Sequence, residues 1–153
     1  MKHTELAYAA GYLDGEGCFL FSKGTPCVRI ENTYIHTLVW FSEIFGGRVR
    51  SKASFDNPNW RQAHVWEIYG DTARNCLNKV IPYLKEKLPQ AKILLEISAY
   101  PPRSHKRDQL VRELRALKRI SYEWNHSNTT QVQHSSAKSS DDSMTQSSSH
   151  PQE

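Results

Sequence analysis

The sequence predicts an α+β fold in which a four-stranded antiparallel sheet carries helices on one of its faces. Two patterns indicate this. Four short segments alternate apolar and polar residues, as half-buried strands do, and they come in two pairs, each preceded by a helical segment. Strands paired in this way favour antiparallel neighbours, and apolar stripes on the helical segments favour packing against one sheet face. The predicted order is αββαββα, followed by further helices.

The first helix is predicted over residues 4–15. Thr4 is a suitable N-cap, and Glu5 suits the positive end of the helix dipole. The side chains spaced to face a core are Leu6, Ala9 and Leu13. A second face of this helix is nearly bare of side chain, which lets another backbone approach closely; it consists of Ala7, Ala10, Gly11 and Asp14.

The strands are predicted in two pairs. The first pair, 18–23 and 27–33, is joined by a turn at residues 24–26, and the second pair is 48–52 and 61–69. A turn cluster over residues 56–59 separates the last two strands. The side chains expected to point inward are Phe19, Val28, Ile30, Val49, Trp66 and Ile68.

The remaining helices cover one sheet face. A helix over residues 35–45 ends at Gly46-Gly47, and the next begins at Asp71 or Thr72 and is tightened at its end by Pro82. Two more helices are predicted over residues 90–99 and 104–120. The last has a net charge of +5 between Arg103 and Arg119, which can contact phosphates or form a solvated helix face.

Composition divides the chain into a domain over residues 1–124 and a polar tail over residues 125–153. Nine of the 29 tail residues are Ser, so the tail cannot bury enough apolar surface to fold, and we expect it to be disordered. The whole chain of 153 residues has a net charge of +4, and the tail contributes −2. The domain therefore carries +6, which suits an acidic partner such as nucleic acid.

Several classes of protein are excluded by composition. Hydrophobic residues make up 38% of the chain and their runs are short, which excludes a transmembrane span. The N-terminal segment has acids where a signal peptide needs apolar residues. An odd count of three cysteines, none in CxxC spacing, argues against disulfides and a zinc site. We expect an intracellular protein, in a cytoplasm or an organelle, with no membrane partner.

The outward face of the predicted sheet is basic. Its outward side chains alternate along the strands and include Ser22, Arg29, Glu31, Thr33, Arg48, Arg50, Lys52 and Arg61. Arg can make bidentate contacts with guanine edges, and Ser or Thr can meet any base. The face therefore suits DNA, although charged wet faces are also common on antiparallel sheets.

A nine-residue motif separates these alternatives. Residues 9–17, Ala-Ala-Gly-Tyr-Leu-Asp-Gly-Glu-Gly, resemble the signature of the LAGLIDADG homing endonucleases. The αββαββα order and the run from Phe45 to Val49 also resemble the core of that family, so the resemblance covers residues 5 to about 98. It implies a LAGLIDADG-like fold with a DNA-binding sheet.

Glu16 is the candidate catalytic residue and metal ligand. It lies at a helix C-terminus, where carbonyl oxygens are unpaired, so its carboxylate and the Gly15 carbonyl form a hard oxygen site for Mg²⁺ or Mn²⁺. The local dipole also favours a bound cation. One carboxylate makes a poor site, and the bare face of Ala7, Ala10, Gly11 and Asp14 can bring two copies together.

The resemblance implies a specific activity. A single motif per chain implies a homodimer that cuts both strands of a long near-palindromic DNA site in a metal-dependent hydrolysis, leaving short 3′ overhangs. By the same resemblance, Lys87 is the basic residue that stabilises the transition state, and the gene belongs to an intron or another mobile element. Asn32 and Tyr34 are the candidates for positioning water. The alternative is a protein of the same fold that does not cut, either an RNA splicing maturase that binds intron RNA or a DNA-binding protein.

Overall fold

The computed structural model describes residues 2–52 and 61–118. The described helices and strands follow the predicted order αββαββα and are α1 (His3–Glu16), β1 (Gly17–Ser22), β2 (Thr25–Asn32), α2 (Ile35–Phe45), β3 (Arg48–Ser51), β4 (His64–Tyr69), α3 (Gly70–Val80), the 3₁₀ turn η1 (Ile81–Tyr83) and α4 (Leu88–Ile97). A further helix occupies residues 105–118. The predicted tail over residues 125–153 and the turn over residues 56–59 lie outside the described residues.

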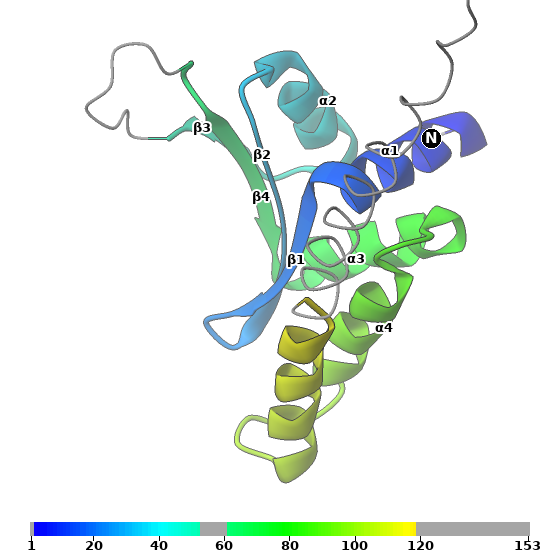
Figure 1. The fold of residues 1–153 in the computed structure, drawn as a ribbon, viewed down its shortest axis with the longest axis vertical. Helices are drawn as coiled ribbons and strands as arrows, with labels where there is room; N and C mark the ends of the chain where they lie inside the picture. The colour runs from blue at the N-terminus through cyan, green and yellow to red at the C-terminus, as the bar shows by residue number, and fades with distance from the viewer. Residues whose placement is uncertain (1, 53–60, 119–153) are drawn as a thin grey trace, which may run out of the picture. The chain divides into compact units, whose positions relative to one another are not determined.

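The sheet has four antiparallel strands in the order β1-β2-β4-β3. All labelled helices lie on one side of it (Figure 1). Five of the six predicted inward residues are buried in the core, namely Phe19, Val28, Ile30, Trp66 and Ile68, and Val49 is partly buried against it. Within residues 2–52 and 61–118, the other face of the sheet carries no labelled helix and forms an open face.

The turn between β1 and β2 differs from the prediction. It consists of Lys23 and Gly24, both with positive φ, at 51° and 79°. Two such residues form the tight hairpin turn whose twist suits antiparallel strands. Residues 25 and 26 belong to β2 instead.

Gly47 sits where the chain between α2 and β3 crosses β4. A Cβ atom there would lie 2.3 Å from Ile68 Cγ2 and 2.7 Å from the Glu67 carbonyl oxygen. Its φ of 94° also disfavours any other residue. Gly47 thus lets the chain pass close to β4 as it enters β3.

Two predicted helix starts are wrong. The N-cap of α1 is Lys2 rather than Thr4, and the Lys2 backbone N–H donates to the Glu5 carboxylate at 2.6 Å. The N-cap of α3 is Tyr69, so neither Asp71 nor Thr72 caps that helix. The expected effect of Pro82 is confirmed, because α3 tightens into η1 at that residue.

The core is apolar throughout, with no buried polar or charged residue among those described. The helix over residues 105–118 joins this core through Leu110 and Leu114. Within the described ranges, no helix is both long enough and apolar enough to cross a bilayer.

Candidate functional site

Three of the predicted functional residues, Asp14, Glu16 and Lys87, meet at the C-terminal end of α1. Glu16 is the last residue of α1 and is exposed, and Gly17 begins β1 immediately after it. The Cα partner of Gly17 across the sheet is Ile30. Glu16 is thus held where α1 enters the sheet, at the end of β1 away from its hairpin turn.

Asp14 ties this end of α1 to the segment between η1 and α4. Its carboxylate accepts hydrogen bonds from the backbone N–H of Lys85 at 2.7 Å and of Lys87 at 2.9 Å. Two backbone donors on one carboxylate fix its direction and satisfy N–H groups near the start of α4. Asp14 therefore braces the end of α1 from within its own chain, and its place at a dimer interface stays a prediction.

The side chain of Lys87 also bonds to the C-terminal end of α1. Its Nζ donates to the carbonyl oxygens of Leu13 at 3.1 Å, Asp14 at 2.5 Å and Gly15 at 3.3 Å. The carbonyls of Asp14 and Gly15 belong to the last turn, which a helix leaves without backbone partners of its own, whereas the Leu13 carbonyl also accepts from the Gly17 N–H. No basic residue of α1 lies in its last turn. Burial lowers the pKa of the Lys87 ammonium, and the charges of Glu86 and Asp14 oppose that shift.

The predicted metal ligands, Glu16 and the Gly15 carbonyl, lie together at this helix end. Glu16 offers an exposed carboxylate, and the Gly15 carbonyl has a second lone pair beside its long bond to Lys87. Across the described ranges, no group of three or more His, Cys, Asp or Glu side chains could hold a metal ion. The donors present therefore fit a divalent cation only if a second chain adds its own.

Helix α1 has an exposed face of small residues, but its members differ in part from the predicted ones. Ala10 is fully buried in the core of its own chain, so its assignment to an exposed face is wrong. The exposed small residues are Ala7, Gly11 and Gly15, one turn apart. A Cβ atom on either glycine would meet nothing within 4 Å. The i, i+4, i+8 spacing of these three residues was the signal in the sequence for this stripe.

Asn32 has both ends of its side-chain amide occupied. Its Nδ2 donates to the Tyr12 hydroxyl at 3.0 Å, and its Oδ1 accepts from the Tyr34 backbone N–H at 2.9 Å. This side chain braces the link between β2 and α2. The Tyr34 side chain is exposed and lies at the rim of a groove. Water positioning by either residue stays a prediction.

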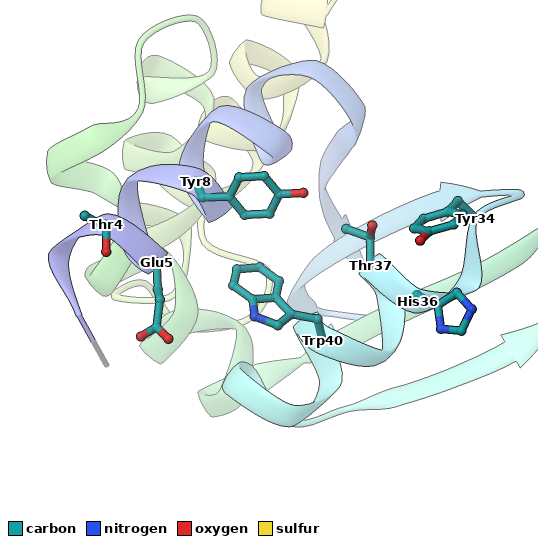
Figure 2. A pocket seen from close by; sticks show the side chains of 7 residues that line it. All are labelled: Thr4, Glu5, Tyr8, Tyr34, His36, Thr37 and Trp40. Atoms are coloured by element: carbon teal, nitrogen blue, oxygen red, sulfur yellow. The ribbon is translucent and has the colours of Figure 1, made fainter.

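That groove, about 430 Å³ in volume, runs between α1 and the N-terminal half of α2. Figure 2 shows Tyr8 of α1 facing Trp40 of α2, and the rings meet edge to face at 5.2 Å between centroids. The other lining residues are Thr4, Glu5, Tyr34, His36 and Thr37. No pattern in the sequence predicted this groove, because its walls come from separate segments.

The open face of the sheet carries most of the predicted polar residues. Register places Arg29, Glu67 and Arg48 in one row across three strands. Glu31 lies in the next row, two residues further along β2. Three residues expected in strands fall outside them: Thr33 follows β2, Lys52 follows β3, and Arg61 precedes β4, which begins at His64.

Two carboxylates organise the charges on this face. Glu31 accepts from Arg29 at 3.1 Å and from Lys52 at 2.5 Å. Glu67 accepts from Arg50 at 3.1 Å and from the Tyr69 hydroxyl at 3.0 Å. The sequence placed Glu31 on this face but did not predict these pairs.

Ser22, the remaining predicted residue of this face, is the half-buried end of β1 beside the hairpin turn.

Solved structures share this fold. The homing endonuclease I-CvuI bound to the I-CreI target with Mg, in which the DNA is not cleaved, matches with a TM-score of 0.61 and 21% identity, over 74% of this chain and 82% of that one. I-CvuI bound to its own target with Ca matches with a TM-score of 0.62 and 21% identity, over the same shares of the two chains. The archaeal intron-encoded homing endonuclease I-Vdi141I, complexed with DNA, matches with a TM-score of 0.59 and 22% identity, over 74% of this chain and 84% of that one. No family model and no curated protein matches the sequence. The resemblance to LAGLIDADG homing endonucleases is therefore confirmed for the fold.

Proposed function

We propose that this protein is a site-specific homing endonuclease that binds double-stranded DNA through the open face of its sheet. As a homodimer, it hydrolyses both strands of a long near-palindromic site in a divalent-metal-dependent reaction and leaves short 3′ overhangs. One observation carries the proposal. Asp14 and Lys87 fix the end of α1 through hydrogen bonds with backbone groups, and they leave Glu16 exposed where α1 enters the sheet.

Two copies are needed because each chain offers one suitably placed carboxylate. The exposed stripe of Ala7, Gly11 and Gly15 allows two α1 helices to approach closely, as small residues do at helix contacts. A two-fold axis along this stripe would bring Glu16 of each chain towards its symmetry mate. The same axis makes the preferred DNA near-palindromic.

Glu16 and the Gly15 carbonyl would hold Mg²⁺ or Mn²⁺ in this dimer. A bound divalent cation supplies Lewis-acid stabilisation of the phosphate and lowers the pKa of bound water. The chain itself supplies orientation. Asp14 fixes the direction in which α1 ends, and Glu16 extends from that fixed end.

Lys87 would contribute to cleavage in two ways, because it holds the end of α1 in position and places a positive charge there. An ammonium has three N–H donors, and those of Lys87 are directed at the carbonyls of Leu13, Asp14 and Gly15. Its positive charge opposes the negative end of the α1 dipole beside Glu16. It can thus stabilise charge developing on a phosphate without a direct bond to it.

The first experiment is a cleavage selection on a randomised duplex library with Mg²⁺, using the wild type and Glu16→Gln. We expect the wild type to cut one near-palindromic sequence. Glu16→Gln keeps the size of the side chain but removes its charge, so binding should persist while the cleavage rate falls by at least about 100-fold. The metal assignment is wrong if Glu16→Gln cuts at the wild-type rate.

The dimer is tested separately with Gly11→Leu. Because a side chain at residue 11 meets open space within one chain, the variant should fold normally as a monomer. In a dimer packed along the stripe, leucine would push the helices apart, and analytical ultracentrifugation should show monomers. If Gly11→Leu sediments as a dimer like the wild type, the proposed interface is wrong.

A protein of the same fold that binds without cutting is the second candidate, either a maturase acting on intron RNA or a DNA-binding protein. The bonds of Asn32 to Tyr12 and Tyr34 favour it, because they commit part of that amide to holding the link between β2 and α2. Enrichment of a sequence by binding, with no cleavage in Mg²⁺ or Mn²⁺, would support this candidate over the endonuclease.

A further inference from the structure

The open face of the sheet carries two carboxylates among its basic side chains, which is unexpected for a surface that binds a polyanion. Glu31 and Glu67 each lie within hydrogen-bond distance of basic groups, at 2.5 to 3.1 Å. Each acid reduces the attraction of this face for phosphates. Their placement therefore needs a reason other than affinity.

The acids hold the basic side chains in fixed directions. Lys52 follows β3 and reaches Glu31 on β2, so its side chain crosses β4. Val65 of β4 is paired with Glu31 and is fully buried although it belongs to the open face. The long side chains around it thus form a layer over the strand.

Both carboxylates are bonded to basic side chains that remain accessible to solvent. The hydrogen bond from Lys52 lowers the pKa of Glu31. Burial raises the pKa of Glu67, but the bonds from Arg50 and Tyr69 outweigh it, so that pKa is lowered as well. The side chain of Arg29 is 32% exposed and that of Arg50 is 50% exposed. A guanidinium has five N–H donors, so each arginine retains donors for another partner.

We propose that Glu31 and Glu67 are specificity-determining residues of the DNA-binding face. They orient Arg29, Lys52 and Arg50 towards base edges and keep these side chains from contacting phosphates without regard to sequence. A side chain that is already oriented loses less conformational entropy on binding its correct partner. The inference rests on the proposed function, because it assumes that this face binds duplex DNA.

The two acids should act on different base pairs. Glu67 is paired with Arg29, which is two residues from Glu31 along β2. Two residues of a strand span about 6.6 Å, close to the rise of about two base pairs. The cations that the acids orient lie in opposite rows, because Arg29, bonded to Glu31, lies in the row of Glu67, and Arg50, bonded to Glu67, lies in the row of Glu31. Loss of Glu31 and loss of Glu67 should therefore relax selection at different base pairs, about two apart.

The test compares the full-length wild type with Glu31→Gln, Glu67→Gln and the control Glu43→Gln. Glu43 is an exposed acid on α2, so its variant loses the same charge away from the open face. Each protein is used for binding selection on a randomised duplex library. Its affinity for the selected duplex and for a scrambled duplex is then measured from 50 to 200 mM salt.

Glu31→Gln and Glu67→Gln should bind the scrambled duplex more tightly and with a steeper salt dependence, by about one released counterion for each freed cation. The ratio of selected to scrambled affinity should fall about tenfold, at base pairs about two apart for the two variants. Glu43→Gln should keep the wild-type ratio.

Three other outcomes would each overturn the inference. If the wild type selects a sequence and both sheet variants keep its ratio and salt slope, the inference is overturned and the proposed function stands. The inference also fails if Glu43→Gln lowers the ratio as much as they do, because the effect is then one of net charge. If the wild type selects no sequence, the proposed function fails and the inference fails with it.

Discussion

The end of α1 and the open face of the sheet both hold charged side chains in place, but they do so with different partners. At α1, every bond that positions Asp14 and Lys87 goes to a backbone group. On the sheet, Glu31 and Glu67 bond to flexible side chains that are a third to a half exposed. Backbone partners cannot rotate away, whereas exposed ion pairs exchange readily with solvent or a ligand.

This difference matches the two tasks of the proposed endonuclease. A catalytic carboxylate has to be held within a fraction of an ångström of its working position, which a backbone clamp provides. A surface that recognises bases has to exchange internal partners for base edges, so its internal bonds must be weak enough to give way. The comparison therefore predicts large effects of substitution at α1 and small effects on the sheet.

The largest effect on stability is expected for Asp14→Ala. It leaves the N–H groups of Lys85 and Lys87 without their charged acceptor, and should lower the free energy of unfolding by about 2–3 kcal/mol. Urea denaturation followed by circular dichroism measures this. The control is Glu43→Ala, an exposed site on α2, where a change within about 0.5 kcal/mol is expected. Equal midpoints for the two variants would mean that the clamp on α1 contributes no stability.

The smallest effect is expected for the sheet pairs and depends on pH. Because the folded-state pKa of Glu31 is lowered, its ion pairs contribute stability above the ordinary glutamate pKa of about 4.3, and this is lost as pH falls through the folded value. Glu31→Gln should therefore unfold slightly more easily than the wild type at pH 7, by a few tenths of a kcal/mol for pairs this exposed.

Thermal unfolding from pH 7 to pH 2.5 checks this, since the melting curves of wild type and Glu31→Gln should converge once Glu31 is protonated. A gap of more than about 1 kcal/mol at pH 7 would mean that the sheet pairs are as important for stability as the clamp, and the contrast between the two regions would be lost.

Local patterns in the sequence determined most of the architecture. The alternation in β1, β2 and β4 predicted which side chains are buried, and α2 spans Ile35–Phe45 as predicted. Such patterns work because burial on one face imposes a period that the residues themselves display. The positions of Glu16 and of the basic strand residues followed from the same periods.

Helix starts and the bare face of α1 were predicted less well. Thr4 was a chemically reasonable cap, but a bond from Lys2 to Glu5 begins the helix two residues earlier. Ala10 was assigned to an exposed face from helical spacing alone, whereas the chain's own core covers it. Spacing defines faces of a helix but does not say which of two small faces meets the core.

That an acidic residue ends a small-faced helix and leads directly into a sheet with a basic face follows from local residue patterns. What holds that helix end is visible only in the folded chain, because Asp14 and Lys87 are more than 70 positions apart. The same holds for Lys52 and Glu31, which meet across an intervening strand. Contacts between distant segments depend on how whole elements pack, and no local period in the sequence encodes that packing.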